Sequence, residues 1–242
     1  MKSTAPLAKQ TILSINQQRV QGPKDFQSIK TINAGRTNTI STDPIAVKPG
    51  SVVDKPCPPL LKPVRKGQKV PLESSVPLTK ISARLGWNIV NSNCDVDVSA
   101  FLLNSDGKVL GDTWFVFYGQ EISPDGSTKF FANDKADRET ISINLSKLNP
   151  NVSKIVLVLT INEALAKNLN FSMIKDAYVR ILDDTSNTEV VSFKMDQYYS
   201  NVTSMMIGEV YRYNGSWKFH AIGNGVARDL AGLCELYGVQ VI

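Results

Sequence analysis

Short apolar runs alternate with clusters of turn-forming residues along most of the chain, from about residue 78 to residue 222. The runs are rich in Val, Ile, Phe and Tyr and have strand length, which is typical of an all-β protein. The pattern predicts ten strands: Leu78–Leu85, Asp97–Leu103, Trp114–Tyr118, Thr128–Phe131, Thr140–Leu145, Ile155–Thr160, Ala177–Leu182, Glu189–Met195, Met205–Tyr213 and Ser216–Ile222.

Turn chemistry and two short helical patterns complete this picture. Asn214-Gly215 between aromatic-rich runs predicts a two-residue hairpin, because both central positions need positive φ. Ser105–Lys108 and Ser123–Gly126 predict tight turns. Helices are expected at Glu163–Asn168 and at Arg228–Tyr237, before Gly238. Ten short strands and two small helices favour a two-sheet β-sandwich.

The first 63 residues differ from the rest. They hold eight of the twelve prolines and one of the nineteen aromatic residues, too little apolar surface to offset the entropy of ordering. Pro56–Pro63 favours extended polyproline geometry, and residues 7–20 show a weak helical pattern. We expect two parts: an extended or disordered proline-rich arm at residues 1–63 and a sandwich domain at residues 64–242.

The positive charge belongs to the arm. Residues 1–63 carry nine Lys or Arg and three Asp, which gives them a net charge of +6. The whole chain has a net charge of +5, so residues 64–242 carry −1. Such an arm can attract an acidic partner. Its charges are spaced singly beside one aromatic residue, Phe26, which argues against nucleic acid. Other proteins, a second copy included, are the expected partners; peripheral membrane association stays open.

Bulk features exclude other classes. No apolar run approaches the ~20 residues of a membrane span, and the amino terminus shows no secretory signal. Three cysteines without a C-x-x-C pair give neither a disulfide framework nor a cysteine zinc site, which indicates the cytoplasm. His220, the one histidine, rules out a histidine-rich zinc site. No nucleophile elbow, dinucleotide loop or phosphate loop occurs, so we expect no enzyme.

Oxygen ligands are the remaining chemistry. Asn93, Asp95 and Asp97 alternate where a loop enters a strand, and alternation places them on one side of the backbone. A second polar stretch follows between two strands, with Asn133, Asp134, Asp137 and Glu139. Converging carboxylates repel unless a cation neutralises them, and calcium takes six to eight oxygens in flexible geometry. Ordinary solvated loops are the alternative, because Asn and Asp are common turn residues.

A series of motifs in the second part resembles the TerD domain of bacterial tellurium-resistance and general stress proteins. The resemblance covers about residues 64–242 and rests on ten segments in order: Lys66-Gly67 to Leu72, Leu85-Gly86-Trp87, Asp95–Leu103, Phe115–Tyr118, Ser123–Ser127, Asn170-Phe171, Ala177–Arg180, Gly208–Arg212, Asn214–Phe219 and Gly232–Val239.

The resemblance implies a β-sandwich that binds calcium through acidic loops at one end, with a role in tellurite tolerance, stress response or phage defence and no established catalysis. Asp95 and Asp97 match the family's aspartates before its Ser-Ala-Phe-Leu-Leu run. Asn133 and Asp134 stand at its Gly-Asp-Asn element, in swapped order. Asp137 and Glu139 fall in its acidic stretch. The resemblance thus implies Ca²⁺ ligands at all six positions.

This chain departs from the family pattern in its second acidic loop. The loop is shortened and contains Lys135 and Arg138, whose positive charges weaken the field for a dication. One metal site is therefore expected to be weakened or lost. The family's usual His-Asp after the Val-Thr-Ile strand is replaced by Asn162-Glu163. The arm has no counterpart in the minimal domain.

Two functions stay open at this stage. The first is a calcium-binding, non-catalytic scaffold module of a tellurium-resistance, stress-response or phage-defence complex. The second is a structural component of a large assembly, such as a virion, in which the sandwich is the building block and the arm interlocks neighbours.

Overall fold

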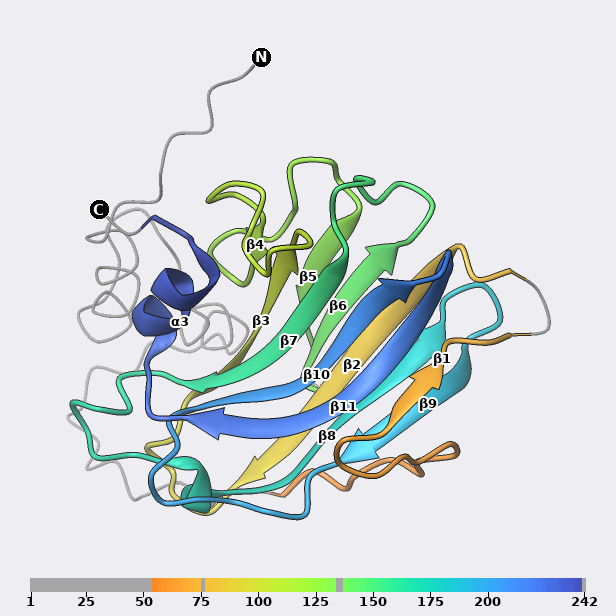
Figure 1. Cartoon of the computed structure of the whole chain (residues 1–242). Helices are drawn as coiled ribbons and strands as arrows, with labels where there is room; N and C mark the ends of the chain where they lie inside the picture. Colours follow the sequence, from red (N-terminus) through yellow and green to blue (C-terminus); the bar gives the residue numbers. More distant parts are fainter. Residues whose placement is uncertain (1–53, 75–76, 134–136, 241–242) are drawn as a thin grey trace, which may run out of the picture.

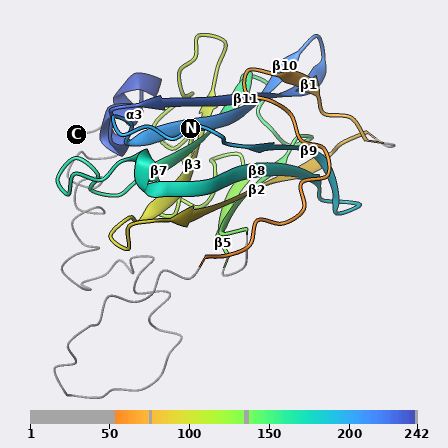
Figure 2. The ribbon, with the colours of Figure 1, turned by 90° about the horizontal axis from the view of Figure 1, so that it is seen from below.

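The protein folds into two antiparallel sheets packed face to face. The computed structural model describes residues 54–74, 77–133 and 137–240, and Figures 1 and 2 show the two layers from the side and from below. One sheet has six strands in the order β1-β11-β10-β7-β3-β4, and the other has five in the order β5-β6-β2-β8-β9. The predicted all-β, two-sheet sandwich is confirmed.

All ten predicted strands are present, with ends shifted by up to four residues. One short strand, β1, was not predicted, because three residues give too little pattern to recognise. The strands are β1 Lys69–Pro71, β2 Lys80–Ile89, β3 Val96–Leu103, β4 Phe115–Val116, β5 Thr128–Ala132, β6 Glu139–Asn144, β7 Lys154–Ile161, β8 Ile174–Asp183, β9 Thr188–Lys194, β10 Ser204–Tyr213 and β11 Ser216–Val226.

One of the two predicted helices is confirmed. Helix α3, Leu230–Tyr237, begins after Asp229 and ends at Gly238, which adopts φ 81°. The helix predicted at residues 163–168 is wrong: this segment forms hydrogen-bonded turns, because Glu163 and Asn168 both have φ 52°, outside the right-handed helical region. A 3₁₀ turn, η1 at Phe171–Met173, follows it. The helical pattern at residues 7–20 lies outside the described residues.

The predicted turns have the expected backbone geometry. Asn214 and Gly215 have φ 49° and 78° and join β10 to β11 as a two-residue hairpin. Gly107 and Gly126 also have positive φ, and the N–H of each donates to the backbone carbonyl three residues earlier, at Asn104 and Ser123. Local turn chemistry therefore fixes three chain reversals of the sandwich.

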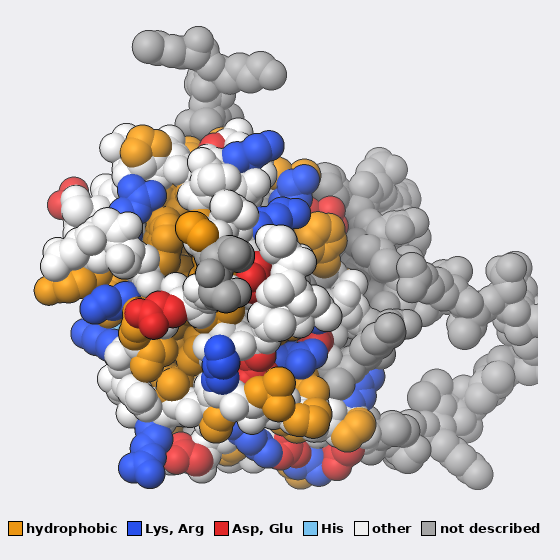
Figure 3. Space-filling model, turned by 90° about the vertical axis from the view of Figure 1, so that its right-hand side faces the viewer, with side chains coloured by type: hydrophobic (Ala, Val, Ile, Leu, Met, Phe, Trp, Pro, Cys, Tyr) orange, Lys and Arg blue, Asp and Glu red, His pale blue; other side chains and the backbone are white. Residues whose placement is uncertain are grey.

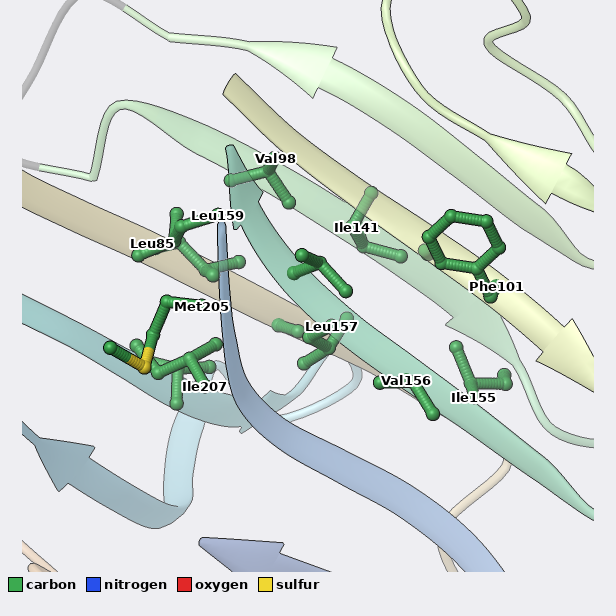
Figure 4. Close-up of a cluster of buried hydrophobic side chains, with 14 of the residues drawn as sticks. Leu85, Val98, Phe101, Ile141, Ile155, Val156, Leu157, Leu159, Met205 and Ile207 are labelled. Atoms are coloured by element: carbon green, nitrogen blue, oxygen red, sulfur yellow. The ribbon is translucent and has the colours of Figure 1, made fainter. Parts of the chain in front are cut away.

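The core lies between the sheets. Every second side chain of the strands points into this layer. Among these are Leu85 and Ile141 from the five-stranded sheet and Leu157 from the six-stranded one, all 0% exposed. Figure 4 shows these side chains together with Val98, Leu159, Met205 and Ile207. At about 25 cal/mol per Å² of buried apolar surface, this layer dominates the stability of the fold.

The turn before β5 is tied to a distant loop by a single carboxylate. Asp125 Oδ1 accepts hydrogen bonds from the hydroxyl groups of Ser123 and Ser127 at 2.6 and 2.7 Å, and Oδ2 accepts the Asn149 N–H at 2.9 Å. Burial alone would raise the pKa of Asp125, but these hydrogen bonds outweigh it and hold the pKa below the ordinary 3.8. The ionised form is therefore favoured by folding.

Replacing Asp125 with asparagine is expected to lower the free energy of unfolding at pH 7 by about 1–2 kcal/mol, because hydrogen bonds to a charged acceptor are lost. A lowered folded-state pKa contributes stability above the unfolded pKa and loses it as the pH falls through the folded value. The difference between wild type and variant should therefore shrink below about pH 4, as measured by urea unfolding. Asp106→Asn in an exposed turn is the control; a difference independent of pH would contradict the prediction.

The face of the molecule at the right of Figure 1 carries both positive and negative side chains. Figure 3 shows Lys and Arg side chains interspersed with Asp and Glu and with apolar groups on that face. No helix in the described ranges is long and apolar enough to cross a membrane. Most of the basic arm, residues 1–53, lies outside those ranges, so its predicted extended character stays a prediction.

Candidate functional site

Polar side chains gather where β3 and β7 run side by side under helix α3. Asp97 and Thr160 are paired in register, and Ser99 pairs with Val158 two residues along. Asp97 and Ser99 alternate with the core residues Val98 and Ala100, so they face away from the interlayer core. The result is a row of oxygen-bearing side chains on the outer face of an otherwise apolar pair of strands.

These side chains line a small cavity between the sheet and the start of α3. Its volume is about 20 Å³, enough for one water molecule or one monoatomic ion. The polar lining comes from β3, from the end of β7 and the turn after it, from Tyr118 and from the N-cap of α3: Asp97, Ser99, Tyr118, Thr160, Asn162, Glu163 and Asp229. No lysine or arginine is part of the lining.

Three oxygens of this lining are buried without a hydrogen-bond partner among the described residues: Ser99 Oγ, Thr160 Oγ1 and Asn162 Oδ1. A buried polar atom left without a partner costs about 1–3 kcal/mol. Such atoms call for an explanation, and three around one small cavity could be satisfied by a water molecule that hydrogen-bonds to them or by a cation that accepts their lone pairs.

The carboxylates of the site have different surroundings. Glu163 forms an ion pair with Lys167, Nζ to Oε2 2.6 Å, and Asp229 Oδ1 accepts the Gly232 N–H at 2.9 Å as the N-cap of α3. Asp97 is 9% exposed and lies in β3 itself. Asp97 is therefore the carboxylate that the strand places most directly beside the orphaned oxygens.

The donor set fits a hard cation. Calcium binds carboxylate, amide carbonyl and water oxygens at variable geometry, and the cavity offers acidic, amide and hydroxyl oxygens with no positive side chain. Within the described ranges, no three His, Cys, Asp or Glu side chains are close enough to hold a metal by themselves. A cation here would therefore depend on neutral oxygens as well as carboxylates.

The second polar stretch is engaged within the protein. Asp137 accepts hydrogen bonds from Tyr178 Oη at 3.0 Å and Arg180 Nε at 3.0 Å, and its Oδ2 forms an ion pair with Arg180. Asn133 donates its amide N–H to Thr140 Oγ1 at 2.8 Å and is exposed. Asp134 lies outside the described residues. Asp137 and Asn133 thus have protein partners on the five-stranded sheet.

Glu139 connects the second polar stretch to the backbone of β3, whereas Asp95 is bonded to the turn after β7. Glu139 lies on the same face of β6 as the core residues Ile141 and Ile143, is 5% exposed, and its Oε2 accepts the Val98 N–H at 2.6 Å. The Asp95 carbonyl accepts the Asn162 N–H at 2.8 Å. Glu139 therefore approaches β3 from between the sheets, whereas Asp97, one residue before Val98, lines the cavity on the outer face.

Arg138, which was expected to weaken the acidic loop, has its own partner. Its Nε donates to the Trp87 carbonyl at 2.6 Å, and its guanidinium lies 5.8 Å from the Trp87 ring centroid. Burial lowers the pKa of Arg138 from its ordinary value. The guanidinium thus fastens this loop to β2. Lys135 lies outside the described residues.

Sequence reasoning missed Ser99, Thr160 and Asn162 as site residues. A signal was present, since Ser99 and Thr160 interrupt runs that are otherwise apolar, and Asn162 directly follows such a run. What the sequence did not show is that these three positions share one cavity, because β3 and β7 are paired across about 60 residues of chain.

The single histidine belongs to a different cluster. His220 Nδ1 lies 3.2 Å from Glu209 Oε1, and Glu209 Oε2 forms an ion pair with Lys154 Nζ at 3.2 Å. The cluster joins β11, β10 and β7 across three adjacent strands. These contacts give His220 a structural role in the six-stranded sheet.

Comparison with known proteins places the fold and the family. Residues 62–237 match the model of the TerD domain. The chain is 38% identical over 184 residues to the tellurium resistance protein TerD of Serratia marcescens, covering 72% of this chain and 96% of that protein. It is 37% identical over 186 residues to general stress protein 16U of Bacillus subtilis, covering 73% and 96%. The crystal structure of SAV2460, a protein of unknown function, matches with TM-score 0.53 at 20% identity, covering 67% of this chain and 98% of that one.

Proposed function

Since the chain belongs to the TerD family of tellurium-resistance and general stress proteins, we propose that it is a calcium-binding, non-catalytic module of a tellurium-resistance or stress-response complex. The observation that carries the proposal is the cavity beside Asp97, in which three buried oxygens have no partner. The relatives' names supply the physiological context, and the cavity supplies the chemistry.

The residues that would hold the ion are those of the cavity. Asp97 would contribute negative charge, and Ser99, Thr160 and Asn162 would contribute neutral oxygens. Asp95 lies two residues before Asp97, and its carbonyl accepts the Asn162 N–H. The bound ion would supply the positive charge that satisfies these oxygens. Because β3, the turn after β7 and the N-cap of α3 all line the cavity, binding would fasten the helix to the sheet.

Of the four remaining residues of the predicted set, Asn133, Asp137 and Glu139 are hydrogen-bonded within the protein, and Asp134 lies outside the described residues. Asp137 and Asn133 are engaged by Arg180 and Thr140, so a second ion at this loop would have to displace those contacts. The proposal therefore assigns calcium to the cavity of Asp97 first and treats the second loop as the weakened site that the shortened sequence indicates.

Calcium is expected to raise the melting temperature of the chelator-treated protein. A ligand at 100 times its dissociation constant stabilises the native state by about 2.7 kcal/mol, which for a domain of this size corresponds to a shift of roughly 5–10 °C. Asp97→Asn should abolish most of the shift, because it removes the cavity's most directly placed negative charge. Differential scanning calorimetry with and without calcium measures both.

Asp106→Asn, the same substitution in an exposed turn, should leave the calcium-induced shift unchanged. Magnesium should give a smaller shift, because it demands stricter octahedral geometry. The calcium proposal is wrong if saturating calcium leaves the wild-type melting temperature unchanged, or if Asp97→Asn, folded by circular dichroism, keeps the full shift.

A further inference from the structure

Residues 54–64 lie as an extended strap across the outer face of the five-stranded sheet. The strap starts at β2 and β8, where Asp54 forms an ion pair with Lys175, Oδ2 to Nζ 2.7 Å. It ends at β9, where Pro63 forms a parallel bridge with Ser192. Figure 1 shows this segment in orange beneath β8 and β9. The family match begins at residue 62, so most of the strap precedes the matched domain across which it lies.

The sheet holds the strap mainly by its backbone. The Asn88 side chain binds both backbone groups of Lys55: its Oδ1 accepts the Lys55 N–H at 2.9 Å, and its Nδ2 donates to the Lys55 carbonyl at 3.0 Å. Glu189 Oε1 accepts the N–H groups of Leu61 and Lys62, both at 2.8 Å. Contacts of this kind select an extended backbone more than particular side chains.

The prolines of the strap match this arrangement. Four of the residues between Lys55 and Val64 are proline and carry no N–H group: Pro56, Pro58, Pro59 and Pro63. The donors at Lys55, Leu61, Lys62 and Val64 each reach an acceptor on β2 or β9. Because the prolines carry no N–H, the strap has few backbone donors that need a partner. A proline-rich segment therefore fits a surface that offers hydrogen-bond acceptors at only a few points.

The face under the strap is built to be covered. Asn88, Tyr178 and Ser192 alternate with core residues along β2, β8 and β9, so they lie on the outer face of the sheet, yet they are 4%, 2% and 0% exposed. Strand β9 is also an edge strand, so one row of its backbone groups faces away from the other strands of the sheet and is available for pairing with another segment. The strap satisfies two of these groups, since Ser192 N–H donates to Lys62 O and Ser192 O accepts the Val64 N–H.

A single turn connects the strap to the rest of the fold. Residues 65–68 carry the chain from β9 of one sheet to β1 of the other, with Gly67 at φ 80° and the Gln68 N–H bonded to Arg65 O at 3.0 Å. A change of backbone conformation at this turn would redirect the strap away from its own domain and leave the groups that residues 54–64 and the sheet offer each other unchanged, although the turn's own bonds to Ala221 would have to adjust.

We propose that the outer face of the five-stranded sheet, at Asn88, Glu189 and Ser192, is an interaction surface for residues 54–64 of a second copy of this chain. A second copy carries the same proline spacing and the same donors, so exchange re-forms every contact of residues 54–64, and the turn at residues 65–68 with its bonds to Ala221 is the part that changes. Exchange of identical segments is a low-cost route to a dimer for this reason. The inference is independent of the calcium proposal.

Disulfide trapping between full-length chains tests the exchange. In a Cys57→Ser background, one chain carries Pro63→Cys and the other Ser192→Cys; bridge partners lie about 5 Å apart at Cα, within the range that a disulfide accepts. Cys94 and Cys234 are buried. After mixing and mild oxidation, a disulfide-linked heterodimer with the 63–192 linkage, identified by mass spectrometry, should form several-fold above the background.

The background comes from a matched pair, Pro63→Cys mixed with Asn151→Cys, which is exposed and off the proposed surface. Adding Glu189→Ala to the Ser192→Cys chain should lower the heterodimer yield, provided the chain melts as a folded protein. The double variant Pro63→Cys/Ser192→Cys tests whether the bridge can close within one chain. If it closes there while the mixed single variants give no more than the background yield, the strap binds only its own domain and exchange is overturned.

Discussion

Replacing Phe101 with alanine is expected to lower the free energy of unfolding by about 3–5 kcal/mol, the largest effect of any single change considered. Phe101 is fully buried on β3, with its ring centroid 4.4 Å from that of Phe115 and 4.6 Å from that of Tyr237 in α3. The substitution removes both aromatic contacts and leaves a cavity between sheet and helix. Thermal unfolding should show a decrease on the order of 10 °C in melting temperature.

The control for this prediction is Phe131→Ala. Phe131 is 49% exposed on β5, so the same loss of a phenyl group should cost well under half as much. Equal melting temperatures for the two variants would mean that α3 does not depend on Phe101 for docking, and would remove the aromatic cluster as the link between the helix and the sheet.

Asp137→Ala is expected to lower the free energy of unfolding by about 2–4 kcal/mol, because it leaves the Arg180 guanidinium without its carboxylate in a mostly buried site. The side chains of Arg180 and Asp137 are 19% and 13% exposed, and Tyr178 loses an acceptor as well. Urea unfolding in the presence of a chelator measures this effect without any contribution from calcium.

The same variant separates two roles for Asp137. As a partner of Arg180, its loss destabilises the chelator-treated protein and leaves the calcium-induced shift intact. As a metal ligand, which is the role that the family resemblance implies, its loss would abolish the shift and change the chelator-treated protein little. Asp176→Asn is the control, because asparagine tolerates the φ of 53° at this position. The ion pair of Asp176 with Lys194 is 38% and 45% exposed, so its loss should cost about 1 kcal/mol or less.

The calcium and strap proposals make separate demands on the molecule. Calcium binding depends on the cavity under α3, on the outer face of the six-stranded sheet. Strap exchange depends on Asn88, Glu189 and Ser192, on the five-stranded sheet. Loss of one should leave the other unchanged, so variants in either site serve as controls for the other.

Short-range patterns were sufficient for the strands and turns. Alternating apolar residues identified ten of the eleven strands, and Asn214-Gly215 identified its hairpin because positive φ favours those residue types. The prediction failed at residues 163–168, where a helical composition gave turns. Glu163 pairs with Lys167 there, a contact that a helix would also allow, so spacing alone could not distinguish the two.

The sequence by itself determined the fold class, the family and the supply of oxygen-bearing residues, because these depend on local patterns and on the order of motifs. Only the tertiary structure decided which oxygens share a cavity and which carboxylate is taken by an arginine. Ser99 and Thr160 meet because β3 pairs with β7, and Asp137 meets Arg180 because β6 and β8 flank β2. Such pairings join residues some 40–60 positions apart, and their energies depend on burial that no local pattern records.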